Sequence, residues 1–319
     1  PDDGQKPSVP DDGQKPSVPN QQSNWISRES NAAVSNFTSH FNLLNKQAEG
    51  TLRHISNLRP DDSGWWFSFQ ADELKYGSKS YRPYTQKLVN QTLGVDWSTE
   101  SSFGILQWGG ALSTTVSDGR FDEGIRTNDS MNGVNMYAKL TLDSAVWFSG
   151  YAGIHYIDYS LKDSHTVKQS GQYGYVAGIG LGYDWQAPAG FTVNPQAGIS
   201  FYGLPSQRYT LNNNDVSVPT SRTVQYYSGL NISRDIDLNG LSISPYSQIM
   251  HRINANPEYS IHMNGNKLNA GLEREQTEFT VGNRVELDKS LIIDLKGDYT
   301  TGGGLKDSKG LSLDIRYIF

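Results

Sequence analysis

The segment QYGYVAGIGLGYDW, residues 172–185, indicates the fold class of this chain, because its side chains alternate between two faces along its whole length. One face carries Tyr173, Tyr175, Ala177, Ile179, Leu181, Tyr183 and Trp185, and the other carries Gly178, Gly180, Gly182 and Asp184. A period of two is the pattern of a β-strand with one apolar face. Strands of globular proteins are usually about five or six residues long. A strand of this length therefore predicts a tilted membrane crossing in a β-barrel.

The same alternation recurs from residue 64 to residue 319, for example at residues 64–74, 132–142, 290–299 and 311–319. We count about twelve such segments, an even number that is typical of outer-membrane barrels. Short links alternate with long polar ones, including those near residues 117–131, 205–222 and 254–267. Bacterial barrels are connected in this manner, with tight turns at the periplasmic end and longer loops outside. The sequence thus predicts an all-β membrane protein, a transmembrane antiparallel barrel of about twelve strands.

Three segments of different character divide the chain. Residues 1–23 contain an almost perfect repeat of PDDGQKPSVP, which predicts a disordered, Pro-rich linker. Residues 24–60 carry apolar side chains spaced by threes and fours among Ser, Asn, Gln and Lys, which predicts a long helix with a thin apolar stripe. Such a helix suits a polar lumen better than lipid. We therefore expect it to traverse the pore of a barrel formed by residues 61–319.

The composition excludes several functional classes. The formal net charge is −6 and Lys and Arg do not cluster, so the chain lacks the basic surface typical of nucleic-acid binding. There is no Cys, and the six His show no metal-ligand spacing, so we expect no metal site and no cofactor. No segment reaches the roughly 20 apolar residues of a membrane-spanning helix. Because Pro1 opens into a polar tract without a signal peptide, we expect a part of a longer exported precursor.

Two short motifs resemble a known family. The stretch FNLLNKQAEGTLRHIS, residues 41–56, resembles a segment of the serine-protease autotransporters of enteric bacteria, in which two adjacent Asn precede Leu-Asn-Lys and a later Leu-Arg. The stretch LSLDIRYIF, residues 311–319, is similar to the closing strand of that group and of many outer-membrane proteins. With its order of linker, helix and strands, the chain resembles the C-terminal translocator domain of a monomeric, type Va, autotransporter.

The resemblance implies an anchor in the bacterial outer membrane that carries an N-terminal passenger across that membrane to the cell surface. The partners that it implies are this passenger, the barrel-insertion machinery of the outer membrane, periplasmic chaperones and lipid or lipopolysaccharide, with the barrel itself a monomer. It also implies that Tyr317 and Phe319 of the closing strand form the signal read by the insertion machinery. Any enzyme activity is expected in the passenger rather than in this chain.

The alternation also predicts which side chains face the pore and which face the membrane. Those expected to face the lumen include Gln70, Lys139, Asp184, Asp314 and Arg316. Aromatic girdles are expected at both membrane interfaces. The periplasmic girdle should contain Trp65, Trp66, Trp97, Trp147 and Trp185, and the outer girdle Tyr76, Tyr81, Tyr84, Tyr159, Tyr209 and Tyr259.

Asn42 is the candidate for an intramolecular reaction. It matches the first Asn of the motif at which precursors of the protease subgroup cut themselves inside the barrel, when the Asn side-chain amide attacks its own carbonyl. The second Asn of the motif is Leu43 here, and a bulky branched neighbour slows closure of the five-membered ring. The sequence leaves self-cleavage at Asn42 open but favours a polar helix residue that lines the pore.

Three other barrel classes are alternatives. A porin or diffusion channel would share the barrel but not the preceding linker and helix. An outer-membrane protease of the omptin type would also share the barrel, but no nucleophile motif such as G-x-S-x-G occurs here. A trimeric adhesin anchor is disfavoured, because each of its chains supplies only a few strands and a heptad stalk.

Overall fold

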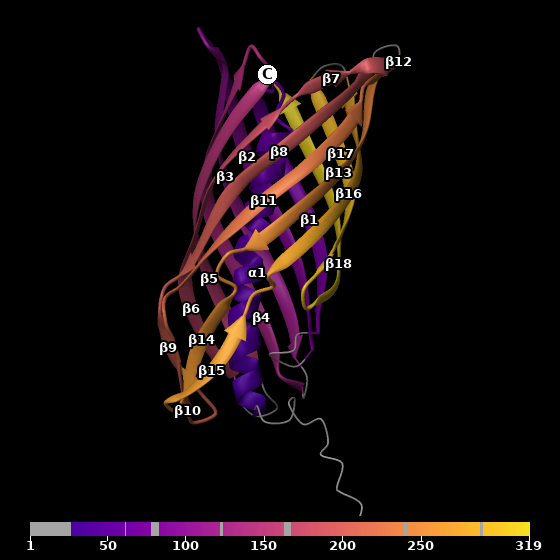
Figure 1. The fold of residues 1–319 in the computed structure, drawn as a ribbon. Helices are drawn as coiled ribbons and strands as arrows, with labels where there is room; N and C mark the ends of the chain where they lie inside the picture. Colours follow the sequence, from indigo (N-terminus) through magenta and orange to yellow (C-terminus); the bar gives the residue numbers. More distant parts are fainter. Residues whose placement is uncertain are drawn as a thin grey trace, which may run out of the picture.

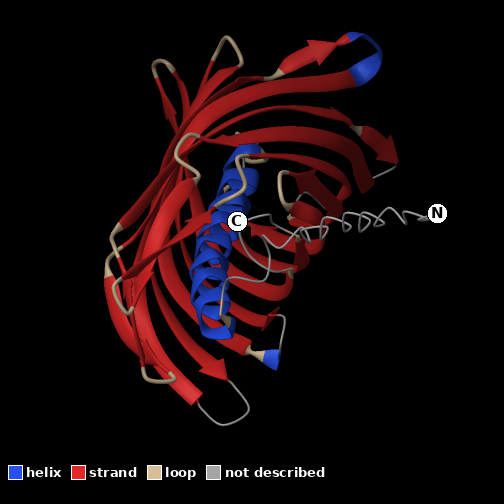
Figure 2. Cartoon of the chain, turned by 60° about the horizontal axis from the view of Figure 1, so that its bottom comes forward, coloured by secondary structure: helices blue, strands red, loops and turns tan. Residues whose placement is uncertain are grey.

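The computed structural model describes residues 27–60, 62–77, 83–121, 124–162, 167–238, 241–287 and 290–319. Within these residues a single long helix, α1 (Arg28–Ser56), lies inside a curved wall of antiparallel strands, as Figures 1 and 2 show. The expected linker, residues 1–23, lies outside the described residues.

The main sheet of the described residues has fourteen strands, of which two are three-residue extensions at the rim, β7 (Trp185–Ala187) and β12 (Ile236–Leu238). The other twelve form the barrel: β1 (Gly64–Tyr76), β2 (Tyr84–Ser101), β3 (Gly104–Phe121), β4 (Arg126–Leu142), β5 (Val146–Lys162), β6 (Val167–Tyr183), β8 (Phe191–Leu204), β11 (Ser221–Arg234), β13 (Leu241–Asn254), β16 (Glu275–Leu287), β17 (Leu291–Gly302) and β18 (Leu305–Ile318).

The barrel is closed. Its last strand, β18, pairs with β1 from Gly64↔Ile318 along the whole length of β1, and β8 pairs with β11 over fourteen positions. Closure pairs the backbone groups that an open sheet would leave exposed to lipid. The predicted antiparallel barrel of about twelve strands, with an N-terminal helix in its lumen, is confirmed.

The two ends of the barrel differ. One end, at the top of Figure 1, has short turns, the extensions β7 and β12, and the C-terminus; we call it the turn end. At the other, which we call the loop end, a separate four-stranded sheet is formed by β9 (Gln207–Leu211), β10 (Asn214–Val218), β14 (Glu258–Met263) and β15 (Asn266–Gly271). The expectation that residues 205–222 and 254–267 are polar loops was therefore wrong, because both contain short strands with buried apolar residues such as Val216 and Ile261.

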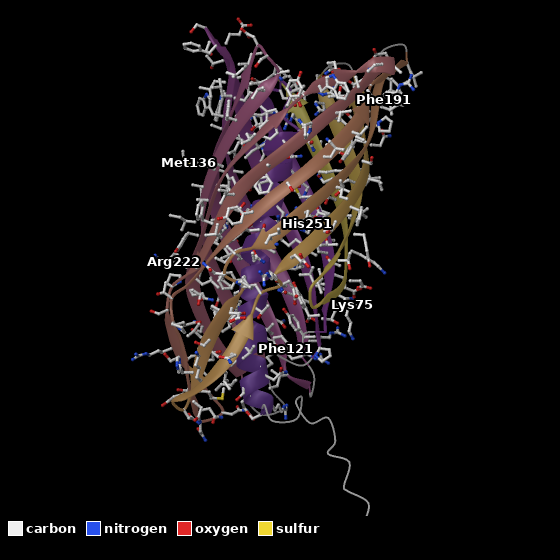
Figure 3. The ribbon with its side chains drawn as sticks, viewed as in Figure 1. Lys75, Phe121, Met136, Phe191, Arg222 and His251 are labelled. Carbon is white, nitrogen blue, oxygen red and sulfur yellow. The ribbon has the colours of Figure 1, made fainter. Side chains whose placement is uncertain are left out.

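The barrel wall is apolar outside and polar inside. Met136, Ile154 and Leu112 are 70%, 66% and 62% exposed, whereas the polar side chains of Gln86 and Ser200 are fully buried. Figure 3 shows Met136 pointing away from the barrel. A surface of this kind would be poorly soluble in water but matches the lipid-facing band of an outer-membrane barrel.

The predicted aromatic girdles are only partly correct. Trp65, Trp97 and Trp185 face outward, but Trp66 and Trp147 are buried in the lumen. At the loop end the error is larger, because Tyr76, Tyr84, Tyr159 and Tyr209 are all buried against α1 or its surroundings. Their rings pack around the helix and do not reach the membrane interface, while Tyr81 lies outside the described residues.

The helix α1 begins at a side-chain cap, since the hydroxyl of Ser27 accepts a hydrogen bond from the backbone N–H of Ser30 at 3.1 Å. Its last turn contains Arg53, whose positive charge interacts favourably with the negative end of the helix dipole. No described helix combines the length and the apolar character needed to span a bilayer by itself. Every residue from Ser30 to Leu44 is buried, which amounts to about four turns covered on all sides.

Candidate functional site

The lumen around α1 is the candidate functional site, because wall and helix meet there through buried polar side chains. The space left beside the helix is small in the middle of the barrel, where a cavity of about 60 Å³ lies between residues such as Gln47 and Gln70. A wider vestibule of about 600 Å³ opens at the turn end, beside the last residues of α1 and Lys139. The helix therefore fills most of the pore in the middle of the barrel and leaves a wide space at the turn end.

A buried charged cluster joins α1 to the wall at the middle of the lumen. We call it the mid-lumen cluster; its members are Lys46, Glu49 and Arg53 of α1 and Asp72, Arg252, Glu278 and Asp298 of the wall. The shortest pairs that cross from helix to wall are Lys46–Asp72 at 3.3 Å, Arg53–Asp298 at 3.2 Å and Arg252–Glu49 at 3.4 Å. Removing one partner of such a pair leaves the other charge buried and unpaired, which is destabilising. The cluster therefore favours one position of the helix in the pore.

The link between α1 and β1 is held at the turn end by three basic side chains of the wall. Lys139 donates to the carbonyl oxygen of Leu58 at 2.8 Å, and Arg284 donates to that of Asn57 at 3.1 Å. Asp62 pairs with both Arg316 and Arg284. Burial by itself would raise the pKa of the Asp62 carboxyl, but the two guanidinium groups more than offset burial and hold this pKa below its usual range.

A second polar contact between α1 and the wall lies next to this link. The ring of His54 lies 3.1 Å from the Asp96 carboxylate and stacks on the indole of Trp66, with ring centroids 3.8 Å apart. Arg316 reaches the same carboxylate at 3.4 Å, and Tyr137 donates a hydrogen bond to it. The last turn of the helix is thus fixed to four different strands.

Asn42 is held by three side chains of the wall. Its carboxamide nitrogen donates to Gln86 at 2.8 Å and to Tyr84 at 3.2 Å, and its carboxamide oxygen accepts from Tyr76 at 2.9 Å. Both hydrogens of the nitrogen are therefore used in contacts with β2. This arrangement directs the amide toward the wall and satisfies its polar groups inside the barrel.

The loop-end sheet covers the N-terminal half of α1. Tyr259 of β14 packs its ring against Phe37 with centroids 4.6 Å apart, and its hydroxyl lies 2.6 Å from that of Thr38. Farther toward the helix N-terminus, the Ser30 hydroxyl contacts the sulfur of Met263 at 3.2 Å. The sheet therefore lies over the helix where it leaves the barrel.

The residues expected to face the pore lie at three places. Gln70 lines the middle of the lumen, and Lys139 and Arg316 hold the link after the helix. Asp314 pairs with Lys296 of the neighbouring strand. Asp184 lies at the rim, where it accepts a hydrogen bond from Asn194 and lines the vestibule.

Tyr317 and Phe319 lie on the outside of the turn end, 57% and 64% exposed. Sequence reasoning did not single out most of the mid-lumen cluster, although Asp72 and Asp298 stood on the polar side of alternating segments. Within the described residues, no group of His, Cys, Asp and Glu has the arrangement of a metal site.

Comparison with known proteins agrees with this geometry. Residues 65–299 match the family model described as the autotransporter beta-domain. A curated relative, the adhesion and penetration protein autotransporter of Haemophilus influenzae, is 22% identical over 230 residues. That match covers 71% of this chain but only 16% of the relative, so the chain corresponds to a small part of that protein.

Solved structures show the same fold. The transport unit of the autotransporter AIDA-I from Escherichia coli has a TM-score of 0.72 at 15% identity, covering 90% of this chain and 99% of that one. The translocator domain of the autotransporter NalP from Neisseria meningitidis has a TM-score of 0.70 at 11% identity, with the same coverage. The beta domain of the Bordetella autotransporter BrkA has a TM-score of 0.67 at 18% identity, covering 81% of this chain and all of that one.

Proposed function

The chain belongs to the autotransporter beta-domain family, and we propose the following function for its helix-filled barrel. The barrel resides in the bacterial outer membrane and is the translocator and anchor of a passenger linked to its N-terminal side. The observation that carries the proposal is α1 itself, which runs through the lumen from the loop end to the turn end. A chain that enters the pore in this direction has its N-terminal side at the loop end, where a passenger would emerge.

We propose that the helix is the end state of export and that it closes the pore. The mid-lumen cluster and the link held by Lys139 and Arg284 support this, because they fix the helix at two heights in the barrel. A porin is the alternative function, and it would need a lumen free of its own chain. An omptin-like protease needs a reactive site on the barrel, whereas translocator domains of this kind are typically not catalytic.

The experiment that tests export uses a reporter passenger placed before Pro1. In intact cells, external protease should remove the reporter while the barrel stays in the membrane and keeps its heat-modifiable mobility on gels. A reporter that stays protected in intact cells and becomes accessible only after the outer membrane is opened would overturn the proposal. The control is the same fusion with a reporter inserted at a turn-end link, near Asp143, which should be protected in intact cells and accessible only after the outer membrane is opened.

We propose that Asn42 is a pore-lining residue and that the chain is not cut there. The three hydrogen bonds that direct its amide toward β1 and β2 support this, as does the bulk of Leu43. The test is gel electrophoresis of the boiled precursor made with its passenger. A single full-length band is expected, and a barrel fragment that begins at residue 43 and is lost in Asn42→Ala would contradict the proposal.

The remaining partners are proposals that rest on the family. Insertion by the outer-membrane barrel machinery, with delivery by periplasmic chaperones, fits a closed barrel whose closing strand ends in exposed aromatic residues. We propose a monomer, because the polar lumen is already filled by the chain's own helix and needs no second copy. The whole protein's activity depends on the passenger and is not specified by this chain.

A further inference from the structure

Three basic side chains lie on the outer surface of the barrel, away from the lumen that α1 occupies. Arg120 of β3, Arg126 of β4 and Lys162 of β5 are exposed at the loop end and share the outward face of their strands with Leu112, Met136 and Ile154. In the strand register, Arg120 lies directly opposite Arg126, and Arg126 lies directly opposite Lys162. We call these three residues the cation row.

This row is electrostatically unfavourable for the protein alone. Like charges directly opposite each other on neighbouring strands repel and destabilise the pairing. Arg120 pairs with Asp118 at 3.2 Å, but among the described residues no carboxylate forms an ion pair with Arg126 or Lys162. The repulsion would be relieved by an anion from outside the chain that contacts neighbouring members of the row.

The outer face changes in steps from the cation row toward the middle of the barrel. The next outward side chains on β4 and β5 are mostly amides and hydroxyls, at Asn128, Ser130, Asn132 and Ser160, together with one carboxylate, Asp158. Still closer to the middle of the barrel is a groove of about 520 Å³. Its apolar lining is Leu112, Val134, Ile154, Tyr156 and Tyr173. The order is positive charge, then hydrogen-bonding groups, then an apolar groove.

The spacing of these steps matches a membrane amphiphile. Lys162 and Tyr156 are six residues apart, which is about 20 Å along a strand, or about 15 Å along the membrane normal at the usual barrel tilt. A phosphorylated sugar headgroup is of this size, and an acyl chain attached to it would enter the groove. Sugar hydroxyls would meet the amides and hydroxyls between the two.

We propose that this surface of β3 to β6 binds the phosphorylated glycolipid of the outer leaflet, lipopolysaccharide. Its phosphates contact the cation row, its sugars contact the polar side chains between the row and the groove, and one acyl chain enters the groove. The inference rests on the outer-membrane location of the proposed function, because only there does the loop end meet this lipid. It adds a specific lipid site to the barrel and does not involve the lumen.

The test measures lipid binding to the full chain, folded in detergent, by native mass spectrometry. The probe is a rough lipopolysaccharide made of lipid A and a phosphorylated inner core, compared with the same lipid after its phosphates are removed. The variant Arg120→Gln/Arg126→Gln/Lys162→Gln should bind the phosphorylated probe at least about tenfold more weakly, since each basic residue near an anionic lipid surface contributes up to about fivefold. The wild-type chain should bind the dephosphorylated probe more weakly to a similar extent.

The matched control is Arg208→Gln/Arg222→Gln/Lys267→Gln, which removes the same charge from three exposed residues on β9, β11 and β15 that do not lie opposite one another. It should bind like the wild type. Equal binding by both triple variants, or equal binding of the dephosphorylated lipid, would overturn the proposal. Displacement of the lipid by inorganic phosphate alone would also overturn it, because the site would then recognise free phosphate.

Heat-modifiable mobility checks that each variant is folded, and display of the reporter passenger separates the two proposals. A chain that reaches the outer membrane and displays its passenger but shows no phosphate-dependent lipid binding disproves only the lipid site. A chain that does not reach the outer membrane disproves the proposed function.

Discussion

Arg53 of α1 and Asp298 of β17 are 245 residues apart in the sequence, yet their side chains lie 3.2 Å apart inside the barrel. Both are buried, and Glu278 lies within 4.0 Å of the same guanidinium. The pair connects the helix to β17, and Glu278 belongs to the neighbouring strand β16, so both wall partners lie late in the sequence. The helix can therefore take its final position only when β16 and β17 are in place.

Replacing Arg53 with Met should destabilise the folded barrel by about 3–5 kcal/mol, because Asp298 and Glu278 would lose a buried partner. The double variant Arg53→Met/Asp298→Leu should recover part of this loss, because it removes one of the stranded charges. Urea unfolding in detergent, followed by Trp fluorescence, measures both. Lys87→Met is the control, since Lys87 contacts Glu73 on the exposed outer surface and its loss should change little. Equal destabilisation by Arg53→Met and Lys87→Met would contradict the role of the cluster.

Asp62 should make the stability depend on pH. Its pKa is lower in the folded chain than in the unfolded one, so its contribution is complete above the unfolded value near 4 and is lost as the pH falls through the folded value. At pH 7 the variant Asp62→Asn should be less stable than the wild type by about 3 kcal/mol. This difference should shrink as the pH falls below about 4. A difference that stays constant below that pH would show that Asp62 does not act through its charge.

Tyr259 should hold the N-terminal half of α1 under the loop-end sheet. Tyr259→Phe keeps the ring on Phe37 and loses the hydroxyl contact with Thr38, so it should cost only about 1 kcal/mol. Tyr259→Ala loses the ring as well. In this variant, amide hydrogen exchange should become faster for residues 28–41 but not for residues 46–56, which the mid-lumen cluster holds. Uniform acceleration along the whole helix would mean that the sheet does not act locally.

Phe319 should matter for assembly rather than for the stability of the finished barrel. It lies outside the barrel at the turn end and is 64% exposed, so few contacts depend on it. Phe319→Asp should lower the amount of heat-modifiable barrel in the outer membrane. Refolding of the same variant from urea into detergent should be close to normal. Loss of refolding in detergent to the same degree would indicate an ordinary structural role.

Much of the barrel could be predicted because alternation is a local property. Residues 172–185 assign each side chain to one face, and the structure follows this assignment, with Ile179 and Leu181 exposed and the intervening glycines on the inner side. The same logic could have corrected the expected girdle. Trp65 and Trp66 are adjacent, so they must face opposite sides of the wall, and Trp66 lies against His54 in the lumen.

The tyrosines at the loop end could not be placed by the same reasoning. A Tyr side chain suits a membrane interface and also a buried site with a hydrogen-bond partner, and Tyr76 and Tyr84 take the second option around Asn42. Which of these two environments a Tyr side chain occupies depends on its contacts with the helix, which lies far from it in the sequence. The four-stranded sheet was missed because its strands have only five or six residues and lie within polar segments.

The partners of the lumen charges follow from barrel closure and could not be read from local pattern. Alternation predicts that Asp298 faces inward. That Arg53 lies next to it depends on the register of all the strands between them and on the height of α1 in the barrel. The same holds for Glu49 and Arg252. The sequence therefore predicts which side chains are inside, and only the three-dimensional structure pairs them.

Single-channel conductance in planar bilayers measures whether the chain's own helix occupies the pore. The intact chain should show only small or brief conductance, and a variant that lacks residues 1–56 should form a wide, stable channel, provided that it keeps its heat-modifiable mobility. A wide channel in the intact chain, with the same conductance after the deletion, would show that the helix does not close the pore.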